Sequence, residues 1–293
     1  DREHVKQIIC TARKQQHGFS FYTRVEGDDI KRHVYCEGRF IMNEDNRVCR
    51  VTGILQDVTR TKMLEQTLKE SNKELETYIY KASHDLRAPI TSILGLAHIS
   101  KYDVKHKKAL DYINKIEITA QKLDETIKGL VQSLTIKDTN QFNDTIKFDS
   151  LINDTLSKYE LKKEYSTIRI QPKLYNRRSF VSNKFILESL FQNLIENAIK
   201  YQKADGKNSY LNIQVKDSAK GVEIKFEDNG IGMDPTSQAR AFDMYYRGTN
   251  QSQGSGLGLY LVKTGVEKLG GTIHLQSAVD KGTTMTLNLP CLC

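Results

Sequence analysis

The sequence has 293 residues, of which 38% are apolar and 27% charged, with four prolines and no tryptophan. This length predicts two or three compact units, and the composition excludes a disordered or fibrous chain. No apolar run approaches the ~20 residues that a membrane-spanning helix needs. The formal charge is +8, but Lys and Arg alternate with Asp and Glu, as on solvated helix faces. We therefore expect no nucleic-acid partner.

The first residue is Asp1 rather than Met, so we expect a fragment of a longer protein. The fragment has neither a signal peptide nor a membrane segment and is expected to be cytoplasmic, while a membrane tether upstream stays open. Five scattered cysteines, without a CxxC pair or zinc-ligand spacing, are expected to be reduced thiols: Cys10, Cys36, Cys49, Cys291 and Cys293.

Residues 17–58 alternate apolar and polar side chains in short bursts separated by turn residues, which predicts antiparallel strands. The last burst ends in the pattern GxxxDVT and passes directly into a helical pattern. About forty residues here resemble the carboxyl-terminal half of a PAS sensor domain, with an unrelated β-hairpin cap as the alternative. We assign residues 1–58 to the carboxyl-terminal part of a PAS-like domain.

Residues 59–138 are predicted to form a coiled coil and a helical hairpin. Apolar residues first recur at alternating spacings of four and three, but three steps of four follow each other around His84. Pro89 favours a kink, and a polar turn near 101–105 precedes a second helical pattern. One apolar stripe on each helix cannot be buried within a single hairpin, which predicts a homodimeric four-helix bundle.

The polar segment 135–144 is interpreted as a linker, with the domain boundary at 139–144, followed by a third domain at 145–293. Strands with helices on one side predict an α/β sandwich there. The predicted helices are 149–160, 183–201 and 257–269. The predicted strands are 210–217, 222–227, 272–277 and 283–289. The fold class is thus multidomain α+β: a partial PAS-like β module, an antiparallel hairpin forming a dimeric bundle, and an α/β sandwich.

The first long helix carries one motif with chemical potential, Ser83-His84-Asp85-Leu86-Arg87-Ala88-Pro89. A neutral imidazole is a nucleophile near pH 7, and the carboxylate of Asp85 can hold its other ring N–H. The motif resembles the phosphoacceptor box of histidine kinases, which implies that His84 accepts the phosphoryl group. A lone helical His is more often a surface or packed residue, which is our interpretation of the other six: His4, His17, His33, His98, His106 and His274.

The motif running from Asn193 to Tyr201 places two asparagines on one helix face. An amide oxygen is a suitable ligand for Mg²⁺. With the motifs that follow, this segment resembles the Bergerat ATP-binding fold of histidine kinases and of gyrase, MutL and chaperone ATPases. The resemblance implies that Asn193 and Asn197 bind the nucleotide, with Asn197 as the Mg²⁺ ligand. It also implies that Lys200 reaches a phosphate and that Tyr201 lines the nucleoside pocket.

Three further motifs extend this resemblance. In Glu227-Asp228-Asn229-Gly230-Ile231-Gly232-Met233, it implies that Asp228 accepts from the adenine amino group and that Gly230 and Gly232 let the backbone approach the ring. In Ala241-Phe242-Asp243-Met244-Tyr245-Tyr246-Arg247-Gly248, Arg247 would meet the γ-phosphate, and Phe242 is expected in the core. The third motif has phosphate-binding glycines but is neither a Rossmann nor a Walker pattern: Gly254-Ser255-Gly256-Leu257-Gly258. The lid from Met233 to Gly254 is short.

The ordered motifs cover residues 59–290 and resemble a sensor histidine kinase. The resemblance implies Mg²⁺ and ATP as cofactors, a homodimer, and catalytic roles for His84, Asp85 and Arg247. It further implies autophosphorylation on His84 and transfer to an aspartate of a response-regulator receiver domain. Ala88 stands where many relatives have Thr or Asn to position a water, so we expect weak phosphatase activity.

Three rival functions are an ATP-driven clamp, a silent scaffold and a nucleic-acid binder. The His box disfavours the clamp, and the nucleotide motifs disfavour the scaffold. No base-reading motif supports the third function. The sequence leaves open the signal, the regulator served, and transfer within or between chains.

Overall fold

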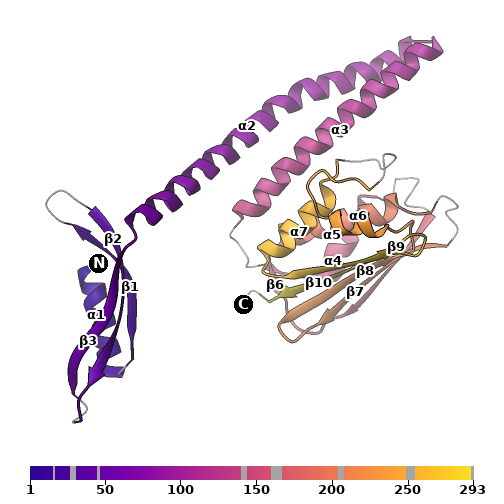
Figure 1. The fold of residues 1–293 in the computed structure, drawn as a ribbon. Coiled ribbons are helices and arrows are strands. Elements are labelled where there is room, and N and C mark those ends of the chain that lie inside the picture. Colours follow the sequence, from indigo (N-terminus) through magenta and orange to yellow (C-terminus); the bar gives the residue numbers. More distant parts are fainter. Residues whose placement is uncertain are drawn as a thin grey trace. The chain divides into compact units, whose positions relative to one another are not determined.

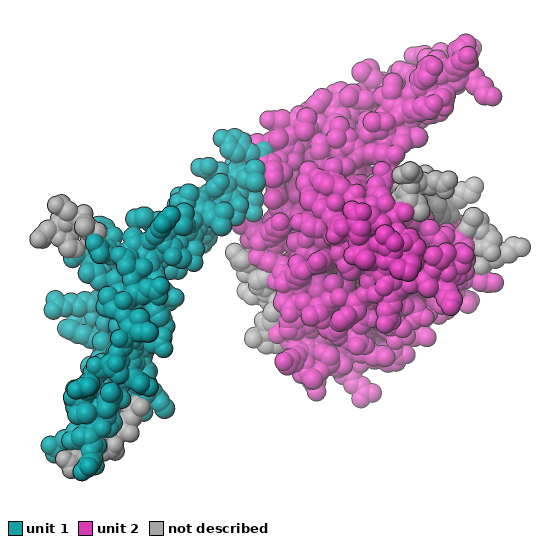
Figure 2. All heavy atoms as spheres, viewed as in Figure 1, with its two compact units in different colours: residues 1–78 teal, residues 79–293 magenta. Residues whose placement is uncertain are grey.

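The computed structural model describes residues 1–15, 17–26, 31–44, 47–139, 144–159, 167–203, 208–248 and 255–291. The chain divides into two compact units, residues 1–78 and 79–293, which Figure 2 shows in different colours. Each unit has its own tertiary contacts and is considered by itself.

The first unit contains a three-stranded antiparallel sheet in the order β1-β2-β3, which confirms the strands predicted there. Its elements are α1 (Arg2–Gln15), β1 (Phe19–Glu26), β2 (Lys31–Met42) and β3 (Val48–Asp57). The sheet passes directly into the next helix because Asp57 Oδ1 accepts the Thr59 N–H at 2.9 Å, while Thr59 Oγ1 accepts the His33 N–H at 2.8 Å. Helix α1 packs against β1 and was not predicted.

The helical hairpin consists of α2 (Thr59–Asp103), which crosses the boundary between the units, and α3 (Lys107–Asp138). Helix α2 continues through Pro89. The linker prediction was wrong for residues 135–138, which are the last turn of α3, because Ile136 is fully buried in the core of the third domain. Residues 140–143 of the predicted linker lie outside the described residues.

Within the described part of the chain, no helix is both apolar and long enough to cross a membrane.

Each helix of the hairpin has apolar residues on two sides. Ile90 and Ala97 of α2 are buried with Ala120 and Ile127 of α3. A second set of apolar side chains is between 43% and 53% exposed: Leu86, Ile93, Ile116 and Leu123. One hairpin therefore buries only part of its apolar surface.

The third domain has a five-stranded sheet in the order β5-β7-β8-β10-β9, with β5 parallel to β7 and the other pairs antiparallel. The strands are β5 (Ile168–Tyr175), β7 (Ser209–Asp217), β8 (Gly221–Asp228), β9 (Thr272–Ala278) and β10 (Gly282–Pro290); β4 (Asp144–Thr145) pairs separately with β6 (Val181–Ser182). The helices are α4 (Phe148–Ser157), α5 (Lys184–Lys200), α6 (Pro235–Arg240) and α7 (Gly258–Lys268). The predicted helices and strands are all present, with ends shifted by three residues at most; β4, β5, β6 and α6 were not predicted.

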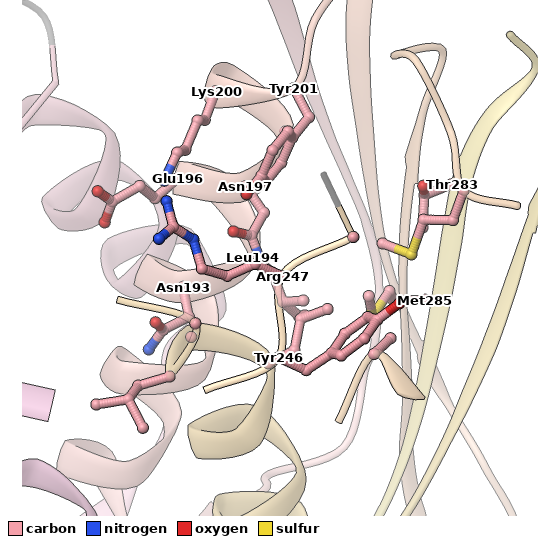
Figure 3. A pocket seen from close by; sticks show the side chains of 18 of the residues that line it. Asn193, Leu194, Glu196, Asn197, Lys200, Tyr201, Tyr246, Arg247, Thr283 and Met285 are labelled. Atoms are coloured by element: carbon pink, nitrogen blue, oxygen red, sulfur yellow. The ribbon is translucent and has the colours of Figure 1, made fainter. Parts of the chain in front are cut away.

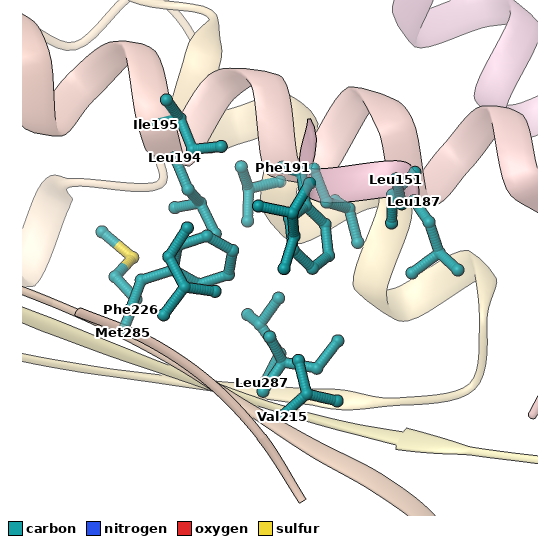
Figure 4. Packing of buried hydrophobic residues seen from close by; sticks show 14 of the residues in the cluster. Leu151, Leu187, Phe191, Leu194, Ile195, Val215, Phe226, Met285 and Leu287 are labelled. Carbon is teal, nitrogen blue, oxygen red and sulfur yellow. The ribbon is translucent and has the colours of Figure 1, made fainter. Parts of the chain in front are cut away.

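The core lies between one face of this sheet and helices α4, α5 and α7, of which α5 and α7 lie side by side in Figure 1. Alternate strand residues such as Val215 and Leu287 point at α5, and Phe191 meets Phe226 edge to face with ring centroids 5.0 Å apart (Figure 4). Gly265 permits the contact between α7 and α5, because a Cβ there would be 2.8 Å from Leu190 Cδ2. This packing confirms the predicted α/β sandwich.

Truncation of Leu190 tests whether this core stabilises the second unit. Leu190 is fully buried, so Leu190→Ala is expected to lower the free energy of unfolding by about 2–5 kcal/mol. Leu174→Ala, on the partly exposed edge strand β5, is the control and is expected to cost less than about 1 kcal/mol. Urea unfolding followed by circular dichroism measures both, and equal losses would contradict the assignment of Leu190 to the core.

Candidate nucleotide site

The third domain contains a cavity of about 560 Å³ whose walls include α5, the end of β8, the start of α7 and part of α3. Figure 3 shows side chains of α5 converging on it, together with Tyr246, Arg247 and two residues of β10, Thr283 and Met285. The cavity brings together most of the site residues predicted from the sequence: Asn193, Asn197, Lys200, Tyr201, Asp228, Gly232, Arg247, Gly256, Leu257 and Gly258. Gly254 lies outside the described residues.

Helix α5 aims the two predicted asparagines at the cavity, because its opposite face is buried against the sheet. That apolar face includes Leu194, Ile195, Ala198 and Ile199, as the motif predicted. Asn193 Nδ2 donates to the carbonyl oxygen of Ser189 at 2.8 Å. A Cβ at Gly258 would come within 3.1 Å of Asn193 Oδ1, so the glycine lets the first turn of α7 approach this amide.

Asp228 ends strand β8 with its carboxylate held on one side only. Its Oδ1 accepts the N–H of Gly230 at 2.8 Å and the N–H of Thr283 at 3.2 Å. No residue in the described ranges donates to Oδ2, which is left to accept a hydrogen bond from a ligand. Burial raises the pKa of this carboxyl, and the two N–H donors oppose the shift.

The two predicted glycines after Asp228 differ in their roles. Gly230 is not among the residues that line the cavity, and a Cβ there would be 2.4 Å from the carbonyl oxygen of Tyr201. Its approach to the base stays a prediction. Glycine is required at this position because the backbone of Gly230 passes close to the Tyr201 carbonyl group at the end of α5. Gly232 does line the cavity, and its φ of +66° lies in the left-handed region that favours glycine.

Two cationic side chains face the same cavity, Lys200 from α5 and Arg247 from the segment after α6. Partial burial lowers the pKa of Lys200, and the positive charge of Arg247 lowers it further, whereas Glu125 and Glu196 oppose the shift. Figure 3 shows the guanidinium of Arg247 directed toward Lys200 and Glu196. An anionic group entering here would meet both cations, which favours phosphate as a ligand.

The described part of the glycine-rich motif forms a tight backbone before α7. Gly256 has a φ of +75°, and its carbonyl oxygen accepts the N–H of Tyr245 at 3.1 Å. Leu257 is buried against Gly129 of α3, where a Cβ would be 2.6 Å from Leu257 Cδ1.

The expectation that Phe242 belongs to the core was wrong, because its side chain is only half-buried and lies outside the core cluster.

His84 and Asp85 lie apart from the cavity lining, on α2, and their side chains are 76% and 81% exposed. His84 Nδ1 is 3.3 Å from Asp85 Oδ1, the arrangement that the motif predicted. Ala88 and Thr91 are also exposed. The imidazole is therefore accessible to solvent. Its Nδ1 faces the carboxylate of Asp85, so Nε2, on the other side of the ring, is the nitrogen that does not contact it.

Several cavity residues were not identified from the sequence. Thr283 reaches Asp228 through the pairing of β10 with β8, a register that no local motif encodes. Helix α3, which belongs to a different predicted domain, contributes four lining residues: Glu125, Lys128, Gly129 and Gln132. Contacts between elements this distant in sequence leave no local signal; Glu196 and Tyr246 lay inside predicted motifs, but no role was assigned to either.

A magnesium ion suits the donors of this cavity. In the part of the chain that the structure describes, no three His, Cys, Asp or Glu side chains cluster to hold a metal by themselves. Mg²⁺ does not need such a cluster, because it keeps several waters and binds phosphate oxygens. Asn197 lines the same cavity as two cations that attract phosphates, which fits this kind of site.

Residues 183–292 match the protein family described as histidine kinase-, DNA gyrase B- and HSP90-like ATPases. The chain is 30% identical over 234 residues to the methanogenesis regulatory histidine kinase FilI of Methanothrix harundinacea, covering 76% of the chain and 25% of FilI. It is 29% identical over 224 residues to the heme sensor protein HssS of Staphylococcus saprophyticus, covering 75% of the chain and 48% of HssS. The chain thus spans between a quarter and about half of these relatives.

A solved structure shares the fold over nearly the whole chain. It is the histidine kinase ThkA in complex with the response regulator protein TrrA, which is 17% identical with a TM-score of 0.51. The match covers 98% of the present chain and 83% of ThkA. It supports the arrangement of a long helical hairpin followed by a sheet-based domain.

Substitution of Asp228 by Asn tests the electrostatics of the site. Because burial raises its pKa, the folded state holds this proton more tightly than the unfolded state. The carboxyl therefore favours folding below its ordinary pKa of 3.8, and this contribution is lost as pH rises through the higher folded value.

Asn keeps an oxygen for both N–H donors but carries no charge. At pH 7 we expect Asp228→Asn to be at least as stable as the wild type, with a smaller loss of stability between about pH 4 and pH 7. Urea unfolding across this range measures the difference, with Glu223→Gln on the same strand as control. A variant markedly less stable at pH 7 would contradict the expectation.

Proposed function

We propose that this chain, a member of the sensor histidine kinase family, binds Mg·ATP in the cavity of its third domain and places the γ-phosphoryl group on His84. The observation that carries the proposal is the convergence of an acceptor carboxylate, an amide and two cations on one cavity, in a chain that exposes an imidazole beside a carboxylate. The ATPase family of residues 183–292 and the histidine kinase FilI support it.

The adenine ring would lie at the Asp228 end of the cavity. Its amino group would donate to Oδ2, the oxygen of Asp228 that has no donor in the described ranges. Guanine presents a carbonyl oxygen at the same ring position, which a carboxylate repels, so Asp228 would select adenine. Ile231, Met233 and Met285 line the same cavity and give the ring apolar contacts.

The phosphate chain would extend toward Lys200, Arg247 and the first turn of α7, where cations and backbone N–H groups favour negative charge. Asn197 would hold Mg²⁺, which offsets the charge of the phosphate oxygens when bound. Arg247 would stabilise the charge on the transferred group, because a preorganised cation costs no rearrangement during the reaction.

The chemical step would be attack by Nε2 of neutral His84 on the γ-phosphorus. An N–P bond forms, the bond from the γ-phosphorus to the bridging oxygen breaks, and ADP leaves with that electron pair. The Nδ1 proton stays on the imidazole and is held by Asp85, 3.3 Å away, which stabilises the positive ring. His84 does not line the cavity, so the γ-phosphate must be brought to it by domain movement or by a second chain.

The phospho-histidine would then pass its group to an aspartate of a response-regulator receiver domain. A solved relative of this fold, ThkA, was crystallised with a response regulator protein, which supports this class of partner. Exposed Ala88 and Thr91 would lie in the docking surface, and the absence of a polar side chain at Ala88 favours weak phosphatase activity. Residues 1–58 would be the carboxyl-terminal part of a PAS-like sensor domain, in a cytoplasmic region of the protein.

The hairpin would form a homodimeric four-helix bundle. Leu86, Ile93, Ile116 and Leu123 remain about half-exposed in one chain, although they continue the apolar stripes of α2 and α3. Pairing two hairpins removes this surface from water at roughly 25 cal/mol per Å² of apolar area. The second chain is therefore the partner that this surface fits best.

Loss of the acceptor imidazole tests the kinase assignment. With γ-labelled Mg·ATP, the wild type is expected to incorporate label that is acid-labile and alkali-stable, and His84→Gln is expected to incorporate none. His98→Gln, an exposed histidine on the same helix, should label like the wild type. Label retained by His84→Gln would refute the acceptor assignment, and an unlabelled wild type would refute the kinase function.

Charge placed in the apolar stripe tests the dimer. Ile116→Glu is expected to leave the fold of one hairpin intact, since Ile116 is about half-exposed, and to shift the chain from the mass of two chains to that of one. A buried unpaired carboxylate in the bundle would cost several kcal/mol, enough to dissociate it at micromolar concentration. Light scattering after gel filtration measures the mass; Lys115→Gln on the same helix is the control.

A further inference from the structure

Tyr246 precedes Arg247 and is fixed by contacts that the kinase mechanism does not use. Its hydroxyl donates to Ser237 Oγ at 3.3 Å, and the guanidinium carbon of Arg240 lies 4.5 Å from the centre of its ring. Ser237 lies on α6 and is buried. The Tyr246 ring is thereby held between two residues of α6.

The direction of this hydrogen bond is set by Asp234. Ser237 has one hydroxyl proton, which it donates to Asp234 Oδ2 at 2.6 Å. Its oxygen can therefore only accept from Tyr246. Hydrogen bonds from the Ser237 side chain and backbone lower the pKa of Asp234, so that the carboxylate remains charged at neutral pH and keeps this order of donors.

Ser237 also contacts the chain on the other side of Arg247. A Cβ at Gly248 would be 3.0 Å from Ser237 Oγ, so this glycine lies directly against the same hydroxyl. The residues on both sides of Arg247 thus meet Ser237. Before them, the Tyr245 N–H donates to the Gly256 carbonyl oxygen at 3.1 Å. This leaves the backbone of Arg247 little freedom.

The two neighbouring side chains point in different directions. Figure 3 shows Tyr246 directed toward Met285 of β10 and Arg247 directed toward Lys200 and Glu196 at the edge of α5. Because the two residues are adjacent in the chain, the orientation of Tyr246 toward the sheet is coupled to the orientation of Arg247 toward Lys200. The hydrogen bond between Tyr246 and Ser237 therefore limits where the guanidinium of Arg247 can reach.

We propose that Tyr246 and Ser237 are positioning residues that direct Arg247 at the terminal phosphate, so that their hydrogen bond sets the preference of the site for ATP over ADP. The inference rests on the proposed function, because it requires a nucleotide in this cavity. Both residues line the cavity, but a direct contact with the base would affect ATP and ADP equally, whereas positioning of Arg247 acts only through the γ-phosphate. Their effect is selective for a nucleotide that has a γ-phosphate, which distinguishes positioning from a general packing role.

The test compares two ligands of the full chain by calorimetry with Mg²⁺ present: the non-hydrolysable ATP analogue AMPPNP, and ADP. Tyr246→Phe removes the hydroxyl and keeps the ring, and Ser237→Ala removes the other partner. Each is expected to weaken AMPPNP binding about three- to tenfold, the value of one hydrogen bond, and ADP binding less than about twofold. The double variant should lose no more than Ser237→Ala alone, because that variant already breaks the bond between Tyr246 and Ser237.

Tyr245→Phe is the matched control, since this half-exposed hydroxyl has no hydrogen bond with the residues that the structure describes. It should leave both affinities unchanged. Equal weakening of AMPPNP and ADP in Tyr246→Phe and Ser237→Ala would overturn the inference in favour of loop packing, and so would unchanged affinities in both. A wild type that binds neither nucleotide would sink the proposed function as well, whereas a wild type that binds both without preference would sink the inference alone.

Discussion

The packing of α5 on the five-stranded sheet is the constraint on which the site depends. Leu187, Leu190 and Phe191 bury one face of the helix, and this fixes its rotation about its own axis. Residues of the opposite face must then project into the cavity, among them Asn193, Asn197 and Lys200. Helix α7 fits against the same helix because Gly258, at its start, and Gly265, near its end, carry no side chain.

The predictions from the sequence succeeded where one segment contains all the information. Strand and helix periods were long enough to locate the major elements of the third domain, and each nucleotide motif lies within a single element and its adjoining turn. The apolar residues between Asn193 and Asn197 correctly indicated a buried face, because helical spacing alone decides which side they share. The exposed position of His84 on α2 was also consistent with its proposed role.

The remaining features depend on contacts between distant segments. Thr283 meets Asp228 only through the register of β10 on β8, and Ile136 extends α3 because the third domain buries it. Gly230 carries the same pattern as Gly232 yet serves the backbone at Tyr201, a difference that depends on the end of α5. The short helix α6 was missed because six residues show no period, although Asp234 and Pro235 are a typical cap and first residue.

The charges around the cavity explain why a divalent cation belongs to the proposed reaction. Lys200 and Arg247 are positive, but Glu125 and Glu196 face Lys200 and compete with any anion for it. A bare triphosphate would meet this opposing charge at short range, where the low dielectric of a partly buried site strengthens repulsion. In the proposed function, the Mg²⁺ that Asn197 would hold would lower the net negative charge of the nucleotide and so weaken that repulsion. The carboxylates would then disfavour free nucleotide more than the magnesium complex, and Arg247 would balance the charge that develops on the transferred group.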